Sequence, residues 1–370
     1  MRIVCVHQGY ELYGSDRCFV ESVGAIRETY PDADIEIVLC KVGPIVELVS
    51  VFADRVVFEP LWILRRSNIL ALATIGLFRF PAALARALLR WRSSDLVYIN
   101  TSVILDYIFA ARFFRRRSLL HIHEIPQGLA LQILRGLVSW SGPEIIFNSN
   151  ATRSAFALSK NHKSHVIYNG ITGPIEPEQT DYDGNRPLRL LMLGRINRIK
   201  GQEVLIRAVQ LLPMDVRERL DVRIIGSAFE DKEAERAISK LVLDAALEKT
   251  IKIDGFVNDT MPLYRWADIV VVPSKLPEPL GRVAIEAMSF GRPVIASEIG
   301  GLPEVVKDQV TGWLIPPGDP TILAGALRWI IERPQSWREF GTAGRRRYEE
   351  LFSAESVRKA LSTVIQSKLK

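Results

Sequence analysis

The stretch Ile269–Ala296 reads IVVVPSKLPEPLGRVAIEAMSFGRPVIA and decides the fold class. It begins with a short run of β-branched residues, Ile269–Val272, which predicts a buried strand. A loop with three prolines follows, then a helical pattern at Arg282–Phe290, and Pro293–Ala296 predicts the next strand. A strand, a helix and a second strand in this order indicate a βαβ unit, whose two strands are parallel.

The same alternation continues in both directions from this stretch. Strand candidates in the second half are Arg189–Leu193, Asp221–Ile225, Ile251–Ile253 and Gly312–Ile315, with helical patterns between them such as Gln202–Leu211. Strand candidates in the first half are Arg2–Val6, Ile35–Leu39, Leu96–Ile99, Leu119–Ile122, Glu144–Phe147 and His165–Tyr168. We therefore expect an α/β protein with parallel sheets in both halves.

Two domains are expected because 370 residues exceed what one hydrophobic core usually organises. The segment Gly170–Pro187, GITGPIEPEQTDYDGNRP, is rich in Pro, Gly and acidic residues and is the expected linker. We place one Rossmann-like domain at residues 1–182 and a second at residues 183–353. Open parallel sheets bind ligands at the carboxyl ends of their strands, so two such domains facing each other would form one deep cleft.

Composition and charge narrow the classes of function. Apolar residues make up 48% of the chain and charged residues 24%, as in a globular protein. The net charge of +6 is compatible with nucleic acid, an anionic membrane or phosphorylated substrates. Neither a zinc-finger spacing nor an aromatic-rich nucleic-acid motif is present, so a nucleic-acid partner is not expected.

The sequence favours a cytoplasmic location. The N-terminus, MRIVCV, predicts a strand and has none of the features of a signal peptide. No uncharged apolar run of about 18 residues predicts a membrane-spanning helix. The three cysteines show no metal-ligand spacing, and free thiols fit a reducing compartment.

Several cofactor motifs are missing from the sequence. No G-x-G-x-x-G is present, so a nicotinamide cofactor is not supported. Lys200–Gly201 has the reverse of the order that a P-loop requires, so a P-loop is absent as well. The D-x-D triplets Asp32–Asp34 and Asp181–Asp183 precede a strand and lie in the linker, respectively, and we interpret both as solvated turns. No cluster of His, Cys and carboxylate residues predicts a metal site.

The strongest signal for chemistry is the pair Glu278 and Glu286, separated by seven residues across a loop and a helix start. Glu278 follows a strand, while Glu286 lies among apolar residues of the expected helix, where an unpaired carboxylate would be costly. Sugar hydroxyls can serve as its partner, and backbone N–H groups near Leu280–Arg282 favour phosphate oxygens. The alternative is an ordinary amphipathic helix with two surface acids.

Two further loops follow strands of the second half. Gly194-Arg195-Ile-Asn-Arg-Ile-Lys200-Gly201 can offer Arg195 and Lys200 to a nucleotide diphosphate, whose charge they would neutralise without a metal. The alternative is a basic solvated turn. Gly300-Gly301 lies before a helix, where glycine amides can approach a ligand closely, or it is a plain turn.

The first half offers two weaker signals. Gly14-Ser15-Asp16 follows the first strand and opens a helix, where Asp16 is at least as well explained as a first-turn acid. His123-Glu124 follows the fourth strand candidate, and His123 can reach the cleft while His121 lies deeper and is expected to be structural.

Taken together, these motifs resemble the retaining glycosyltransferases of family 4, which have the GT-B fold. The resemblance covers nearly the whole second half through Gly194-Arg195…Lys200-Gly201, Ile224-Ile225-Gly226, Gly255-Phe256-Val257, Ala267-Asp268 through Pro273-Ser274, Glu278…Glu286-Ala287-Met288, Gly291-Arg-Pro-Val, Gly300-Gly301…Glu304 and Thr311-Gly312. The first half matches more loosely, through Gly14-Ser15-Asp16, His123-Glu124, Asn148-Ser149 and Val166-Ile-Tyr-Asn-Gly170.

The resemblance implies that the first domain is the acceptor side, that the second binds a nucleotide sugar, and that helix 354–370 packs back on the first. It implies His123 and Glu278 at the reacting sugar, and Ser15, Asp16 and Glu124 on the acceptor side. It implies donor contacts from Gly14, Arg195, Lys200, Gly226, Phe256, Val257, Leu280, Gly281 and Glu286. It further implies retention of the anomeric configuration and no metal or other cofactor. Tyr13-Gly14 departs from the family's usual glycine pair, and Leu280 stands where an aromatic residue is common.

The looser first half looks like enzymes of bacterial polysaccharide or lipid-linked glycan assembly. A lipid-linked acceptor would suit binding to the inner face of an anionic membrane through Leu61–Arg92, where the apolar stretch Leu70–Phe80 is followed by Pro81 and an expected helix Ala82–Arg92. One stripe of that helix carries Leu84, Leu88 and Trp91, another carries Arg86, Arg90 and Arg92, and Arg115-Arg116-Arg117 extends the basic patch. The alternative is a helix packed against the first sheet.

Two alternatives to a glycosyltransferase remain at this stage. One is another enzyme with a similar fold, such as a sugar-nucleotide epimerase or a phosphorylase. The other is a catalytically silent nucleotide-sugar-binding protein, against which the presence of Arg195, Lys200, Glu278 and Glu286 argues.

Overall fold

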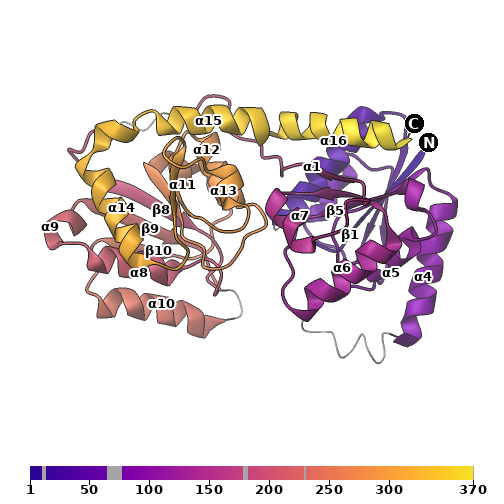
Figure 1. The fold of residues 1–370 in the computed structure, drawn as a ribbon, viewed down its shortest axis with the longest axis horizontal. Coiled ribbons are helices and arrows are strands. Elements are labelled where there is room, and N and C mark those ends of the chain that lie inside the picture. The colour runs from indigo at the N-terminus through magenta and orange to yellow at the C-terminus, as the bar shows by residue number, and fades with distance from the viewer. Residues whose placement is uncertain (11–13, 65–76, 178–181, 229–230, 370) are drawn as a thin grey trace. The chain divides into compact units, whose positions relative to one another are not determined.

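The computed structural model describes residues 1–10, 14–64, 77–177, 182–228 and 231–369. The chain forms two compact units, one of Met1–Gly170 with Ala354–Lys370 and one of Ile171–Ser353 (Figure 1). Each unit contains a parallel sheet flanked by helices, which confirms the predicted α/β class.

The described part of unit 1 contains a seven-stranded sheet in the order β3-β2-β1-β4-β5-β6-β7. Its strands are β1 Arg2–His7, β2 Asp34–Leu39, β3 Arg55–Phe58, β4 Leu96–Ile99, β5 Ser118–Ile122, β6 Glu144–Phe147 and β7 Ser164–Val166. Its helices are α1 Gly14–Thr29, α2 Ile45–Ser50, α4 Leu77–Arg92, α5 Leu105–Ala111, the 3-10 turn η3 Arg115–Arg117, α6 Leu129–Ser141, α7 Asn150–Phe156 and α16 Ala354–Leu369.

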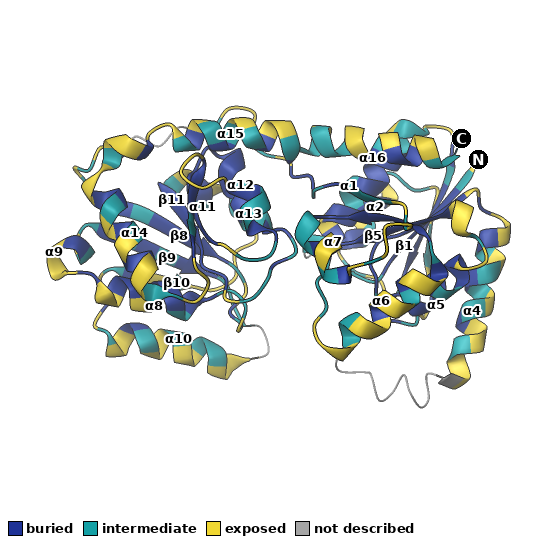
Figure 2. Cartoon of the chain, viewed as in Figure 1, coloured by how far each residue is buried: buried dark blue, intermediate teal, exposed yellow. Residues whose placement is uncertain are grey.

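Successive side chains of each strand point to opposite faces of the sheet. Helices cover both faces, so the side chains on both are buried. Ile3 and Cys5 of β1 pack with α1, α2 and α16, whereas Val4 and Val6 pack with α4, α5 and α6. Figure 2 shows β1 and β5 in the colour of buried residues. Burial raises the pKa of the Cys5 thiol far above its ordinary value. The apolar runs that predicted the strands therefore fill two cores, one on each side of the sheet.

Helix α16 completes the first of these cores. Its residues Leu361 and Ile365 are buried with the apolar side chains of α1. Its Arg358 forms ion pairs of 2.8 Å with Glu21 and with Glu28, both on α1. The last helix of the chain thus belongs to unit 1.

The described part of unit 2 contains a six-stranded sheet in the order β10-β9-β8-β11-β12-β13. Its strands are β8 Leu188–Leu193, β9 Leu220–Ile225, β10 Ile251–Asp254, β11 Ile269–Val272, β12 Val294–Ser297 and β13 Gly312–Ile315. Its helices are α8 Gln202–Leu211, α9 Met214–Arg217, α10 Lys232–Asp244, α11 Met261–Trp266, α12 Arg282–Ser289, α13 Leu302–Val305, α14 Pro320–Glu332, the 3-10 turn η4 Pro334–Trp337 and α15 Phe340–Leu351.

The boundary between the units follows Gly170, whereas the sequence placed it after residue 182. Ile171 forms a bridge with Ser353, and the N–H of Gly173 donates to the Tyr348 hydroxyl at 2.7 Å, which ties this segment to unit 2. Tyr182 stacks on Trp337 within the core of unit 2. These long-range contacts cannot be read from the Pro- and Gly-rich composition of the segment.

Helix α4 differs from its prediction in two respects. Its described residues are Leu77–Arg92 and Pro81 lies inside the helix, so Pro81 does not open it. Trp91 is fully buried, and Leu84 and Leu88 pack against the same core, so the predicted membrane-facing stripe is wrong. Most of the apolar stretch Leu70–Phe80 lies outside the described residues.

Arg90, which the sequence places on the membrane face, is half-buried in an ion-pair network. Its guanidinium donates to Glu36 at 2.5 Å, to Glu59 at 2.7 Å and to the Tyr107 hydroxyl at 2.9 Å. Although burial opposes the shift, hydrogen bonds from Arg2 and Arg90 lower the pKa of Glu36. Arg90 therefore compensates buried carboxylates and is not available to a lipid surface.

Candidate functional site

The candidate site residues of unit 2 lie in loops at the carboxyl ends of its strands. Lys200 follows β8 and Glu278 follows β11, and the Lys200 ammonium donates to Glu278 Oε2 at 2.8 Å. The Ser274 hydroxyl donates to the other carboxylate oxygen of Glu278. The structure thus brings together two residues that the sequence predicted separately. Because Glu278 is only 7% exposed, these contacts compensate the cost of burying its charge.

Close backbone contacts hold these two loops against each other. The N–H of Lys275 donates to the carbonyl of Ile199 at 2.7 Å. Gly201 has a φ of +77°, and a Cβ there would lie 2.2 Å from the Pro273 carbonyl oxygen. Only glycine permits this approach, so the Lys-Gly sequence places the Lys200 ammonium beside Glu278.

Gly300 and Gly301, in the loop after β12, contact the backbone of Glu278. The N–H of Gly301 donates to the Glu278 carbonyl at 2.8 Å. A Cβ on Gly300 would lie 2.6 Å from the Glu278 backbone nitrogen. The glycine pair therefore packs on the backbone of Glu278.

Glu286 of α12 has partners within the protein, contrary to the expectation that it needs one from a ligand. The Tyr264 hydroxyl donates to its Oε2 at 2.7 Å, and Arg282 lies 3.4 Å from Oε1. Its side chain is 26% exposed, so the carboxylate is accessible and is not enclosed by the apolar face of the helix. Burial and Glu286 together raise the pKa of Tyr264, which keeps that hydroxyl a donor.

The remaining predicted donor residues have distinct local environments. Gly226 follows β9, and a Cβ there would lie 2.0 Å from the Gly194 carbonyl oxygen, so it joins the loops after β8 and β9. Gly281 precedes α12 with a φ of +94° and contacts Leu302, while Leu280 is buried. Arg195, Phe256 and Val257 are exposed after β8 and β10. Their donor contacts stay predictions.

In unit 1, the candidate residues gather at a pocket of about 500 Å³ at the carboxyl ends of β1, β4 and β5. Ser15, Asp16, His123 and Glu124 all line it, together with Gln8, Gly9, Tyr10, Leu64, Thr101 and Val103. Gly14 is the first residue of α1 and is not among the lining residues. The structure thus brings together four residues from two separate motifs.

His7 is a buried residue of this region that the sequence analysis missed. Its Nε2 lies 2.7 Å from Asp16 Oδ1, and its ring stacks on Phe19 at 4.6 Å. A Cβ on Gly9 would lie 1.7 Å from Asp16 Oδ1, so a larger residue there would displace the Asp16 carboxylate from His7. Asp16 is therefore the partner of His7 as well as a first-turn acid. The available signal was a histidine at the carboxyl end of the first strand.

Asn100, also missed, connects this pair to His123. Its Nδ2 lies 3.1 Å from His7 Nδ1, and its Oδ1 lies 2.9 Å from His123 Nε2. His123 Nδ1 lies 3.1 Å from Asn169 Oδ1. His7, Asn100 and His123 lie at the carboxyl ends of the adjacent strands β1, β4 and β5, so the order of strands in the sheet brings these three together, while Asn169 follows β7.

His121 has the structural environment expected for it. It is buried, and its Nδ1 lies 2.6 Å from the Tyr98 hydroxyl. Burial, and secondarily the neighbouring His123, lower the pKa of His121 well below its ordinary value. The centre of the His121 ring lies 3.9 Å from that of the His123 ring. His121 is therefore a neutral packing partner of His123.

Both carboxylate oxygens of Glu124 accept hydrogen bonds from residues of unit 1. It accepts hydrogen bonds from the Thr101 hydroxyl at 2.7 Å and from the N–H and hydroxyl of Ser102, both at 2.6 Å. The N–H of His123 donates to its second oxygen at 3.0 Å. Glu124 therefore fixes the loop after β4 against the end of β5. In the described ranges, no three His, Cys, Asp or Glu side chains gather as a metal site would require.

Comparison with known proteins shows that the second unit is similar to a known family. Residues 178–347 match the family model described as glycosyl transferases group 1. The D-inositol 3-phosphate glycosyltransferase of Geodermatophilus obscurus is 35% identical over 172 residues, which are 45% of this chain and 37% of the relative. The alpha-maltose-1-phosphate synthase of Mycolicibacterium smegmatis is 32% identical over 211 residues, 51% of this chain and 53% of the relative. The chain thus spans between about a third and a half of the length of these curated relatives.

Solved structures resemble the whole chain at lower identity. Anabaena HepE in complex with UDP and glucose has a TM-score of 0.80 and 23% identity, covering 99% of this chain and 100% of HepE. WaaG, a glycosyltransferase involved in lipopolysaccharide biosynthesis, has a TM-score of 0.69 and 13% identity, with 99% of each chain covered. Together with the two parallel sheets, these likenesses identify the GT-B fold. The second unit is thus similar in sequence to the group 1 glycosyl transferases, over the matched residues 178–347.

Proposed function

We propose that the chain is a retaining glycosyltransferase that moves a sugar from a nucleoside-diphosphate sugar to a glycan or lipid-linked acceptor. The observation that carries the proposal is the Lys200–Glu278 pair at the carboxyl ends of β8 and β11, in a group 1 glycosyl transferase domain. HepE, which has been solved with UDP-glucose, supports the choice of donor, and the similarity to the glycosyltransferase of G. obscurus supports glycosyl transfer.

The chemistry of the loops fits such a donor. A diphosphate carries about two negative charges, which Lys200 and the exposed Arg195 would neutralise through charge-assisted hydrogen bonds. Stabilising the departing diphosphate in this way lowers the barrier to breaking the bond to the sugar. Glu278 would then accept hydrogen bonds from sugar hydroxyls, and Glu286 from the ribose. The pocket of unit 1 would hold the acceptor beside His123.

A thermal-shift screen of nucleotide sugars, followed by a transfer assay, tests this function. A donor present at one hundred times its dissociation constant stabilises the fold by about 2.7 kcal/mol. Arg195→Ala or Lys200→Ala should weaken diphosphate binding by about 1.5–3 kcal/mol, because each removes a charge-assisted contact. Arg207→Ala, an exposed position on α8, is the matched control.

The products of the assay separate the competing activities. Transfer with retained anomeric configuration supports the proposal. An epimerised nucleotide sugar, phosphorolysis, or binding without turnover would each overturn it. Equal diphosphate affinity in the wild type and both variants would remove Arg195 and Lys200 from the donor site.

We also propose that unit 1 binds the cytoplasmic face of an anionic membrane in the bacterial cell envelope, through α6 and its neighbours. Residues 77–92, 112–117 and 129–141 contain arginines and no acidic residue. Helices α4, α5 and α6 pack side by side on one face of the sheet (Figure 1). None of the helices in the described residues is long and apolar enough to span a bilayer.

This face of unit 1 exposes large apolar side chains, although the predicted stripe of α4 is buried. The large apolar side chains exposed there are Phe78, Leu89, Phe113, Leu129, Ile133 and Trp140. On α6, the spacing of Leu129, Ile133 and Trp140 places them on one side of the helix, and the Arg112 guanidinium lies 5.5 Å from the centre of the Trp140 ring. Apolar side chains among arginines suit an interfacial helix on an anionic surface.

Liposome flotation tests the membrane proposal. The wild type should float with anionic liposomes at low salt, and Leu129→Glu with Ile133→Glu should abolish flotation. Leu243→Glu, an exposed leucine on α10 of unit 2, is the control. Absence of wild-type flotation, or equal loss in the control, would contradict membrane binding through α6.

A further inference from the structure

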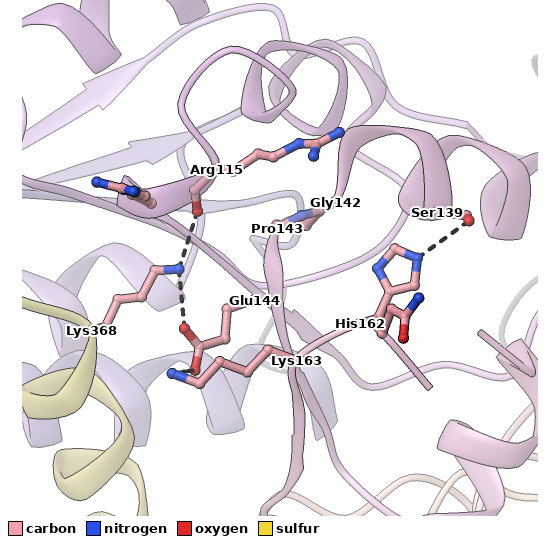
Figure 3. Close-up of a pocket in the computed structure, with 10 residues that line it drawn as sticks. Arg115, Ser139, Gly142, Pro143, Glu144, His162, Lys163 and Lys368 are labelled. Atoms are coloured by element: carbon pink, nitrogen blue, oxygen red, sulfur yellow. Dashed lines mark hydrogen bonds and ion pairs between the residues drawn. The ribbon is translucent and has the colours of Figure 1, made fainter. Parts of the chain in front are cut away.

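A second pocket lies at the amino end of the unit 1 sheet, whereas the candidate site lies at the carboxyl ends of the strands. Its volume is about 380 Å³. It is formed by η3, the end of α6, the first residue of β6, the loop before β7 and the last turn of α16 (Figure 3). The pocket shares none of its lining residues with the pocket that contains His123.

The charged lining of this pocket is strongly positive. Arg115, Arg116, Lys163 and Lys368 line it together with one carboxylate, Glu144, which leaves an excess of three positive charges. Lys368 lies 3.1 Å from Glu144 Oε2, and Lys163 lies 2.9 Å from Oε1. Burial would raise the pKa of Glu144, but hydrogen bonds from Lys163, His165 and Lys368 lower it. One carboxylate thus cannot account for the number of cations.

The two arginines have hydrogen-bond donors to offer. Arg115 is fixed by donating from Nε to the Ser141 carbonyl at 3.0 Å and from Nη2 to the Trp140 carbonyl at 3.2 Å, and its Nη1 has no partner in the described chain. Gly142 has a φ of +64°, and a Cβ there would lie 3.1 Å from the Arg115 guanidinium. Arg116 is exposed, and its side chain makes no hydrogen bond or ion pair to the described residues.

Further polar groups face the same space. His162 lines the pocket, with its Nε2 3.4 Å from the Ser139 hydroxyl. Lys163 has a 60% exposed side chain, although it pairs with Glu144. Guanidinium groups match the geometry of phosphate oxygens, and lysine adds a point charge. The volume admits a phosphate group with an attached alcohol.

We propose that this pocket binds the phosphate of a phosphate ester, held by Arg115, Arg116 and Lys163. The ester is either a soluble metabolite or the headgroup of an anionic lipid, since both present the same group. The proposal does not depend on glycosyl transfer, because none of these residues belongs to the candidate site.

Binding of glycerol 3-phosphate, measured by calorimetry, and of phosphatidylcholine vesicles with and without phosphatidic acid tests the proposal. Arg116→Ala and Lys163→Ala should each weaken binding by about tenfold, as expected for one lost charge-assisted contact. Arg117→Ala and Lys160→Ala are matched controls, because they remove the same charges from neighbouring residues that do not line the pocket. Lys163→Ala leaves Glu144 paired with Lys368 and His165, so the fold should persist.

The pattern across the variants decides between the outcomes. Binding of glycerol 3-phosphate that is lost only in the pocket variants supports a soluble ester. Binding only to phosphatidic acid vesicles, with the same pattern, supports a lipid headgroup. Equal effects in pocket variants and controls would show general charge attraction and overturn the proposal. Loss of glycerol 3-phosphate binding in Lys200→Ala would assign the phosphate to the donor site and overturn it as well.

Discussion

Lys200 and Glu278 are 78 residues apart in the sequence and form an ion pair of 2.8 Å between the loops after β8 and β11. The family resemblance assigns Lys200 to the donor diphosphate and Glu278 to the donor sugar. In the structure each compensates the charge of the other, with the Ser274 hydroxyl on the remaining oxygen of Glu278. The pair therefore keeps both loops in register before a donor arrives, and its charges are already positioned.

A double-mutant cycle with Lys200→Met and Glu278→Gln should reveal this coupling in the free energy of unfolding. Each single substitution should cost about 1.5–3 kcal/mol, because it leaves a buried charged partner without its hydrogen bond. The double variant should cost less than the sum. Urea denaturation measures all four proteins. The pair Lys275–Glu203 joins the loop after β11 to the first turn of α8 and is more exposed, so its cycle should give about 1 kcal/mol or less. Additive costs at Lys200 and Glu278 would show that the pair does not stabilise the loops.

Transfer activity should persist in excess EDTA. Arg195 and Lys200 would supply positive charge to the departing diphosphate, which removes the need for a metal at that position. Activity is measured after dialysis against EDTA and again after addition of magnesium or manganese. Complete loss in EDTA with recovery on adding either metal would contradict the proposed role of the two cations.

Much of the fold could be predicted because its strands are buried on both faces. The strands Ile269–Val272 and Gly312–Ile315 and the helix Gln202–Leu211 all have the predicted bounds. Strand β3, Arg55–Phe58, was missed because it lies at the edge of the sheet, starts with an exposed arginine and has an apolar run of only three residues. The periodicity of α4 was visible, but periodicity alone does not distinguish a core-facing from a lipid-facing stripe. The Trp91 indole N–H, which donates to Ser118 at 3.1 Å, shows that it faces the core.

The candidate site was predictable only as separate motifs. Glu278 and Lys200 each follow a strand, yet their contact depends on β8 and β11 being neighbours in the sheet. The same holds for His7 and Asn100, whose motifs are unremarkable until β1, β4 and β5 are placed side by side. Strand order is a tertiary property that short sequence patterns do not contain.

His123→Ala should lower turnover by about a hundredfold or more while leaving donor affinity nearly unchanged. His123 lines the pocket of unit 1 that we propose to hold the acceptor, so its loss should affect the reacting sugar and not the nucleotide. Turnover and donor dissociation constants are measured on the same preparations. Unfolding curves show whether losing the His123 contacts with Asn100 and Asn169 destabilises the fold. His165→Ala, outside this pocket, is the control. Near-normal turnover would leave His123 with a structural role only.

Asp106→Asn should stabilise the protein above pH 6, because Asp106 is held in an environment that disfavours its charge. The residue lies in the first turn of α5, is 1% exposed, and its Oδ1 has no hydrogen-bond partner among the described residues. Burial raises the pKa of Asp106 from 3.8 to about 6. The folded state thus binds the proton more tightly than the unfolded state does.

The sign of the pH dependence follows from this shift. The contribution of Asp106 to stability is fully present below pH 3.8 and is lost as the pH rises through about 6. The pKa difference corresponds to a cost of roughly 3 kcal/mol once the carboxyl is ionised. The amide introduced by Asp106→Asn cannot ionise, so the gain in stability should grow between pH 4 and pH 7 and then level off. Urea denaturation at each pH measures it. Asp244→Asn, at an exposed position on α10, should change stability by no more than about 0.5 kcal/mol at any of these pH values. Parallel pH profiles for the wild type and Asp106→Asn would mean that the unfolded and folded states bind this proton equally, which burial without a partner for Oδ1 does not allow.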